Sequence, residues 1–200
     1  MKTIDHKILA KYVIKEANVK LPYIYETAFI IGNIEPDKNI FTYLHGIIKG
    51  KKFRGHNYNN ILPIMRKIFN ILKSKERFSV NDYYKLGKLM HYIVDSFTFP
   101  HNDIFKGSLR EHCKYEQELH EEMFNELDYY SNLHVSNSIE EFNDIENLHE
   151  KYIETAGNKM VDYSFIFTAI QVILQTIAEK TYLYTNMESC SCTEVSYNRN

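Results

Sequence analysis

Histidines and carboxylates recur at helical spacing in the middle of the chain. His91 and Asp95 are four residues apart, and His112 and Glu116 repeat this spacing further along. On a helix, two residues four apart leave the same face one turn apart. His101 lies in a break between the two pairs, where the backbone could bring it beside either one. Imidazole and carboxylate groups together are the ligands of zinc and similar divalent ions.

A simpler interpretation exists for each pair, because a histidine and a carboxylate at this spacing often form only a hydrogen bond. The surroundings of His91 and Asp95 are apolar, which predicts a buried helix. The flanking apolar residues are Leu86, Leu89, Met90, Ile93, Val94 and Phe97. A buried aspartate needs strong partners. Metal ions would provide them, and a hydrogen-bonded His–Asp pair in the core is the alternative.

The elements that position these residues are predicted to be helices. Apolar residues recur at three- and four-residue spacing, and only seven glycines and four prolines interrupt the chain. The predicted helices span 5–18, 22–31, 39–48, 57–75, 79–95, 108–131, 138–156 and 159–185. Gly32 and Pro36 predict a turn after the second helix. The pattern favours a single all-α domain over 1–185, a compact multi-helix bundle, with a polar, flexible tail over 186–200.

Composition excludes several other classes of protein. The net charge of −2 gives no broad basic surface, so we expect no stable nucleic-acid complex. The N-terminal residues lack the apolar core of a signal peptide, and no apolar run approaches the roughly 18 residues of a membrane span. Cys113, Cys190 and Cys192 form no disulfide framework, which predicts a cytoplasmic protein. Peripheral contact with a membrane is compatible with this composition.

The stretch HYIVDSFTFPH resembles the signature of the zinc-dependent phospholipase C family, which is H-Y-x-x-D, a proline-containing segment and then H. Downstream, HCKYE is similar to that family's H-x-x-x-E. Upstream, FIIGNIEPDKN is similar to its G-x-x-x-P-D segment, and GKKFRGHNY to the histidine-bearing loop that follows. IDHKILAKY resembles the helix with the first metal histidine. These segments follow the family's order, and the zinc-dependent fungal single-strand nucleases share the fold and metal site.

The resemblance implies two to three zinc ions. It assigns Asp37, His56, His91 and Asp95 to the first ion, His101, His112 and Glu116 to the second, and His6 with a bridging Asp95 to the third. In secreted members, the amine and carbonyl of an N-terminal tryptophan also hold the third ion. This chain has no tryptophan, so either Met1 supplies these groups or the third site is weak or empty. His45 competes with His56, whose loop resembles the family's more closely.

The remaining polar residues have ordinary interpretations. His120, His134 and His149 are expected to be solvated histidines on helix surfaces. Pro100 directly precedes His101, whereas the family's proline stands two residues before its histidine, and this difference could alter the loop without removing a ligand. Cys190 and Cys192 alone are only a weak motif for a soft metal.

The resemblance implies a phosphodiesterase that acts on a small phosphoester or a phospholipid head group through zinc-bound hydroxide. Asp37 could orient or deprotonate the attacking water, or it could serve only as a ligand. A nuclease or nucleotidase with the same metals is one alternative, and it would need aromatic side chains that stack on a base. A non-catalytic protein whose zinc ions join helices is another, and its coordination would be closed. The oligomeric state is left open.

Overall fold

The computed structural model describes residues 1–38, 57–130 and 140–191. The predicted helix over 39–48 lies outside these residues. So do the candidate ligands His45 and His56, together with His134.

Every regular element in the described ranges is a helix. The elements are α1 (Thr3–Glu16), α2 (Tyr23–Lys38), α4 (Tyr58–Lys73), α5 (Val80–Ser96), the short 3₁₀ helix η1 (Phe99–His101), α6 (Leu109–Tyr130), α7 (Phe142–Thr155) and α8 (Lys159–Ser191). Most boundaries lie within a few residues of those expected, although α8 continues past the predicted end near 185. The prediction of an all-α, single-domain fold is confirmed.

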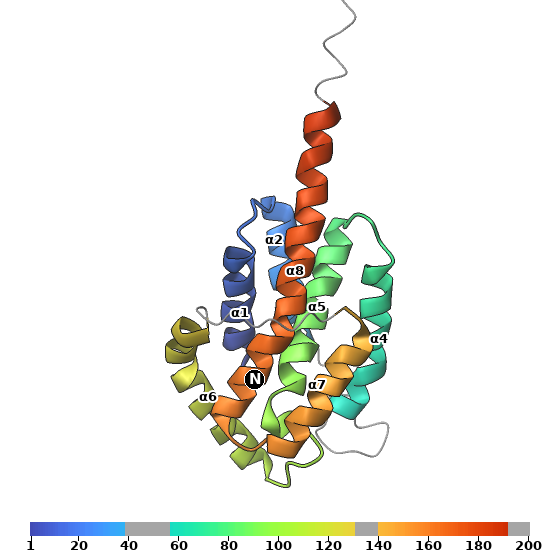
Figure 1. Ribbon diagram of the computed structural model, residues 1–200. Coiled ribbons are helices and arrows are strands. Elements are labelled where there is room, and N and C mark those ends of the chain that lie inside the picture. The colour runs from blue at the N-terminus through green and yellow to red at the C-terminus, as the bar shows by residue number, and fades with distance from the viewer. Residues whose placement is uncertain (39–56, 131–139, 192–200) are drawn as a thin grey trace, which may run out of the picture.

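The helix α5 forms the centre of the bundle. It lies between α2 and α4 and behind α8 in Figure 1, and it contacts all three as well as α1. Its buried aliphatic residues are Leu86, Leu89, Met90, Ile93 and Val94. The helix begins after Ser79, whose backbone N–H donates a hydrogen bond to Asp82 at 3.0 Å, as a helix N-terminus requires. The central position of α5 explains how His91 and Asp95 come to be surrounded by other helices.

The turn predicted at Gly32 and Pro36 is wrong, because α2 continues through both residues to Lys38. Gly32 and Gly87 instead allow α2 and α5 to approach closely. A Cβ atom at Gly32 would lie 2.0 Å from the carbonyl oxygen of Tyr84, and one at Gly87 would lie 2.0 Å from that of Phe29. Only glycine fits such contacts between main chains. Packing against α5 outweighs the local preference of glycine and proline to end a helix.

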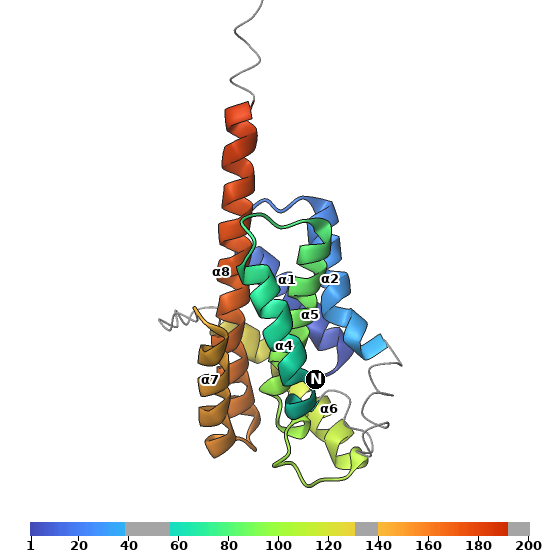
Figure 2. The same ribbon diagram turned by 90° about the vertical axis from the view of Figure 1, so that its right-hand side faces the viewer.

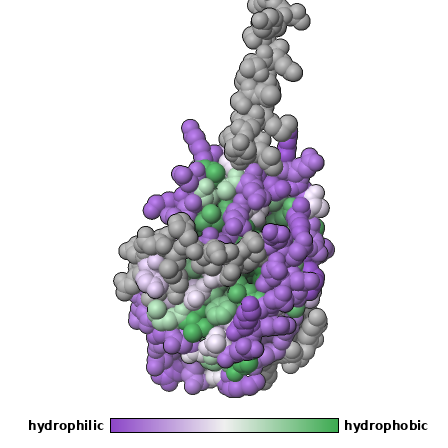
Figure 3. Space-filling model, in the orientation of Figure 1, coloured by the Kyte–Doolittle hydropathy of each residue, from purple (hydrophilic) through white to green (hydrophobic). Residues whose placement is uncertain are grey.

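The helix α8 carries a long apolar segment that was not expected from the sequence. Its part Lys159–Thr181 is long and apolar enough to cross a membrane by length and composition, and 56% of its most apolar window is buried inside the protein. A core helix has the same length and hydropathy, so packing against the bundle is sufficient to explain this segment. Figure 3 shows the face of the molecule that is toward the viewer in Figure 1. Hydrophobic residues lie in the middle of this face, and hydrophilic residues border them.

The N-terminus lies at one end of the bundle, beside α6. The two views at right angles place it close to this helix, in the lower part of the molecule (Figures 1 and 2). The short helix η1 follows α5 at the same end. Residues from the beginning of the chain, the end of α5 and the first turns of α6 therefore meet there.

Candidate metal centre

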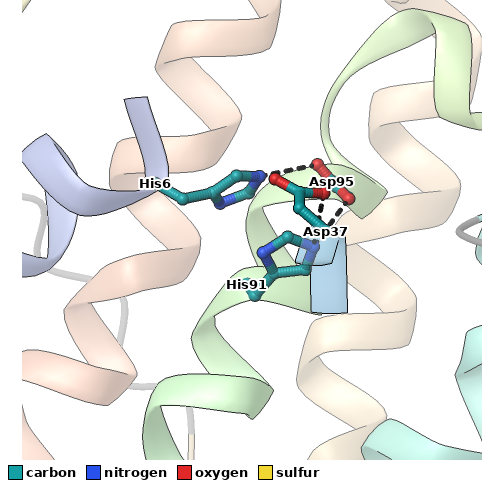
Figure 4. A group of neighbouring side chains, drawn as sticks. All are labelled: His6, Asp37, His91 and Asp95. Carbon is teal, nitrogen blue, oxygen red and sulfur yellow. Dashed lines mark hydrogen bonds and ion pairs between the residues drawn. The ribbon is translucent and has the colours of Figure 1, made fainter. Parts of the chain in front are cut away.

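The first ligand group consists of His6, Asp37, His91 and Asp95. Their ligand atoms all lie within 4.8 Å of one another (Figure 4). His6 comes from α1 and Asp37 from the last turn of α2, while His91 and Asp95 share one face of α5. The close packing of α1 and α2 on α5 therefore converts a local pair of side chains into a group of four.

Asp95 lies at the centre of this group, with one oxygen toward each histidine. Its Oδ1 is 3.1 Å from His6 Nε2, and its Oδ2 is 3.2 Å from His91 Nε2. His91 Nε2 also lies 3.6 Å from Asp37 Oδ1. The two imidazole rings stack with their centroids 3.9 Å apart. A carboxylate whose oxygens face two different partners has the arrangement that a bridging ligand needs.

Burial and neighbouring charges set the protonation of this group. His6, His91 and Asp95 are fully buried, whereas the Asp37 side chain is 13% exposed. Burial, together with the nearby His91, lowers the pKa of His6 to about 4, so His6 is neutral at pH 7. Burial alone would raise the pKa of Asp95, but His101, the Met1 amino group and the histidines of the first group hold it well below its usual value. Neutral imidazole and ionised carboxylate are the forms that bind metal ions.

The second ligand group consists of His101 from η1 and of His112 and Glu116 from α6, with ligand atoms again within 4.8 Å of one another. Glu116 Oε1 lies 3.1 Å from His101 Nε2 and 2.9 Å from His112 Nε2. This group is more open than the first, because the His112 side chain is 25% exposed and that of Glu116 is 16% exposed. The structure thus brings the second pair together with the intervening histidine, which the spacing alone could have placed beside either pair.

The amino group of Met1 joins the two groups. It donates hydrogen bonds to Asp95 Oδ1 at 3.0 Å and to Glu116 Oε1 at 2.9 Å, and it lies 3.0 Å from His101 Nε2. Burial would lower the pKa of this amine, but the charges of Asp95 and Glu116 raise it to about 11. The amine of Met1 thus lies between the two ligand groups and contacts both.

The donor set and its spacing fit zinc. A tetrahedral zinc ion with bonds of about 2.0–2.2 Å holds its ligand atoms roughly 3.3–3.6 Å apart. The separation of His91 Nε2 from Asp37 Oδ1 is 3.6 Å, and its separation from Asp95 Oδ2 is 3.2 Å. Imidazole and carboxylate groups are also ligands that zinc prefers. The first group could therefore accept the ion with only small movements.

Two residues that the sequence did not single out hold the first group in place. The backbone carbonyl oxygen of Asn33 accepts a hydrogen bond from His91 Nδ1 at 2.9 Å, and this contact directs Nε2 of the ring toward the carboxylates. The Thr3 hydroxyl donates to Asp37 Oδ2 at 2.8 Å. Partners of this kind fix the tautomer and orientation of metal ligands. No motif marks them, because each depends on a contact between different helices.

Two histidines expected to be solvated have specific partners, so that prediction is wrong. His149 is 5% exposed, stacks on Tyr58 with ring centroids 3.4 Å apart, and donates to Asn102 Oδ1 at 2.8 Å. His120 is partly buried, and its Nδ1 lies 2.5 Å from the buried Asp5 Oδ1. Helical periodicity alone could not identify these contacts, because the partners are distant in sequence.

Comparison with known proteins agrees with this geometry. A family model described as zinc dependent phospholipase C matches residues 5–162, a span that includes every member of both ligand groups. The chain belongs to this family. No significant match was found among curated proteins or among solved structures. Membership of the zinc dependent phospholipase C family and the two ligand groups together support a metal-dependent, phospholipase C-like function.

Proposed function

We propose that this protein is a zinc-dependent phosphoester hydrolase that cleaves a phosphodiester of a small molecule or a phospholipid head group. The observation that supports this most strongly is the meeting of the two ligand groups at Asp95. His101 Nδ1 lies 3.7 Å from Asp95 Oδ2, so a residue of the second group is next to the central carboxylate of the first. Adjacent metal sites of this kind are typical of enzymes that cleave phosphate esters.

The chain would hold two to three ions. In this proposal Asp37, His91 and Asp95, with His56 from outside the described residues, hold the first, and His101, His112 and Glu116 hold the second. His6, Asp95 and the Met1 backbone hold the third, provided that the Met1 amine releases its proton. Bound zinc supplies Lewis acidity, which lowers the pKa of a bound water and offsets the charge of the phosphate.

Asp37 is our candidate for the residue that orients or deprotonates the attacking water. It is the member of the first group whose side chain reaches solvent, with 13% exposure, while His91 beside it is fully buried. The hydrogen bond from Thr3 fixes its Oδ2 and leaves Oδ1 toward His91. A carboxylate in this position can accept a proton from water on the open side of the group.

The surroundings of the second group favour a lipid-like substrate over a nucleic acid. Ile104 is 37% exposed and Leu109 is 59% exposed, and both lie between His101 and His112 in the chain. Exposed aliphatic residues beside an active site suit an apolar substrate or membrane surface. Phe105, in the same segment, packs edge-on against Phe99 and His112 rather than standing as a free platform for a base.

Metal analysis combined with activity assays tests the proposal. Protein never exposed to chelator should contain two to three zinc ions per chain, and it should hydrolyse a chromogenic phosphodiester and a phosphocholine ester faster than single-stranded DNA. Asp95→Asn should abolish turnover and the binding of the first and third ions, because Asp95 is the proposed ligand that these two ions share. Glu122→Gln, at a solvent-accessible carboxylate on α6, is the matched control and should retain both. Less than one zinc ion per chain in the wild type would contradict the proposal.

A further inference from the structure

The carboxylate of Asp162 accepts three hydrogen bonds inside the protein. This residue lies in the first turn of α8 and is fully buried. Its Oδ2 accepts from the backbone N–H of Phe99 and from the Tyr115 hydroxyl, both at 2.9 Å. Its Oδ1 accepts from the Tyr152 hydroxyl at 2.7 Å. One side chain of α8 thus joins η1, α6 and α7.

Two of these three donors stand next to residues of the second ligand group. Phe99 begins η1, the short helix that ends at His101. Tyr115 directly precedes Glu116 on α6. The side-chain hydrogen bonds described for Asp162 are to these two neighbours and to Tyr152. Asp162 therefore contacts the segments that carry the ligands and not the ligands themselves. One oxygen atom, Asp162 Oδ2, therefore bridges η1 and α6.

The other side of His101 is fixed by a separate set of hydrogen bonds. Asn102 Nδ2 donates to the carbonyl oxygens of Ser96 and Thr98, each at 3.0 Å, and its Oδ1 accepts from His149 Nε2 at 2.8 Å. These contacts shape the turn after α5 but do not reach α6. Besides the direct contact of His101 Nε2 with Glu116 Oε1 and the Met1 amine that reaches both residues, the hydrogen bonds of Asp162 connect this turn to the helix that carries Glu116.

Energetics also indicate a role in geometry. Burial raises the pKa of Asp162 to about 6, so its charge is unfavourable in this position even with three donors. A buried charge with partners adds little net stability, and apolar groups of similar size can replace such networks without loss. What the network provides is a single arrangement of its donors. A fixed arrangement is most important where two residues, here His101 and Glu116, must bind the same ion.

We propose that Asp162 is a positioning residue for the second ligand group, holding η1 and α6 at the separation at which His101 and Glu116 bind one metal ion. The inference rests on the proposed function only in requiring that this group binds metal. In this way α8, which carries none of the candidate ligands that the structure describes, would contribute to metal binding through Asp162. Second-layer partners of metal ligands typically contribute 10- to 100-fold to metal affinity.

Substitutions that remove single hydrogen bonds test this role. Asp162→Asn keeps the shape of the side chain but replaces one acceptor oxygen, and Tyr115→Phe removes one donor without changing the carboxylate. Tyr83→Phe is the matched control, because it removes a buried tyrosine hydroxyl that contacts Thr181 at 3.3 Å, away from both ligand groups. Zinc content and zinc affinity are measured with a competing chromogenic chelator. The melting temperature of each zinc-free protein is recorded as well.

We expect Asp162→Asn and Tyr115→Phe to weaken the binding of one zinc ion per chain about 10- to 100-fold and to leave the other ions bound. Tyr83→Phe should retain every ion even if its melting temperature falls as much as those of Asp162→Asn and Tyr115→Phe. Wild-type affinities in both Asp162→Asn and Tyr115→Phe would overturn the inference, as would an equal loss of all ions that follows the melting temperature. If Asp162→Asn does not fold, Tyr115→Phe decides. Wild-type protein that binds zinc but cleaves no phosphoester would overturn the proposed function and leave this inference intact.

Discussion

Replacement of Gly87 by alanine tests whether the close approach of α2 and α5 builds the first ligand group. The added Cβ would lie 2.0 Å from the carbonyl oxygen of Phe29 and 2.8 Å from the backbone nitrogen of Asn33. Both atoms belong to the main chain of α2, so neither can rotate out of the way. Ordinary contacts between heavy atoms are about 3.5 Å or more. The two helices must therefore separate locally by about 1 Å or more.

The energetic cost follows from this separation. Overpacking a core costs about 1–3 kcal/mol, and a contact with main chain belongs at the upper end of this range. The better helix propensity of alanine recovers about 1 kcal/mol. We expect the free energy of unfolding of the zinc-free protein to fall by about 2 kcal/mol. The shift would also carry Asp37 away from His91, which is now 3.6 Å distant, and would move the Asn33 carbonyl that orients this ring.

Urea unfolding of zinc-free protein measures the stability, and chelator competition measures the affinity of each zinc ion. Metal sites tolerate distance errors of only about 0.2 Å, so the ion of the first group should bind at least about 10-fold more weakly in Gly87→Ala. Asn81→Ala, on an exposed position of the same helix, should change stability by less than about 0.5 kcal/mol. Unchanged stability and full zinc affinity in Gly87→Ala would refute the link between helix approach and ligand geometry.

Three further perturbations test other parts of the centre. A glycine added before Met1 should displace the buried amino group from Asp95 and reduce the zinc content by about one ion, which mass spectrometry can count; an unchanged content would argue against a role for this amine. Thr3→Val should weaken binding of the first ion about 10-fold without loss of helical circular dichroism, whereas an unchanged chelator competition would show that Asp37 needs no such support. Burial lowers the pKa of His149 to about 4, below the value of about 6.5 expected in the unfolded chain. Between pH 4 and pH 6.5, His149 is therefore protonated in the unfolded chain and neutral in the folded protein. Zinc-free wild type should therefore lose up to about 3 kcal/mol more stability than His149→Gln as the pH falls from 6.5 to 4, and parallel urea-unfolding curves would refute this.

The local part of the site could be predicted from the sequence. Four-residue spacing places His91 beside Asp95 and His112 beside Glu116 on any helix, and the apolar pattern identifies both helices correctly. The start of α5 after Ser79 was equally local, since a cap depends on the few residues around it. Periodicity and capping need no knowledge of the rest of the fold, which is why these predictions agree with the structure.

The parts that depend on contacts between helices could not be predicted in this way. Gly32 has a local preference to end a helix, yet its role is set by Tyr84 of α5, whose carbonyl leaves no space for a Cβ. His149 has the spacing of a surface histidine, yet Tyr58 and Asn102 bury it. The order of family segments from His6 to Glu116 added long-range information that the spacing lacks, and the family assignment it suggested is confirmed.

The course of α2 shows how the fold and the chemistry depend on each other. Had α2 ended at Gly32, as glycine and proline preferences suggest, neither the Asn33 carbonyl nor Asp37 would follow the surface of α5. His91 would then lose the acceptor for its Nδ1 and a carboxylate 3.6 Å from its Nε2. The helix can continue only because two glycines permit main-chain contact with α5, and that contact compensates for a proline inside the helix. Residues that contribute no ligand atom therefore decide whether His91 faces a carboxylate from a second helix.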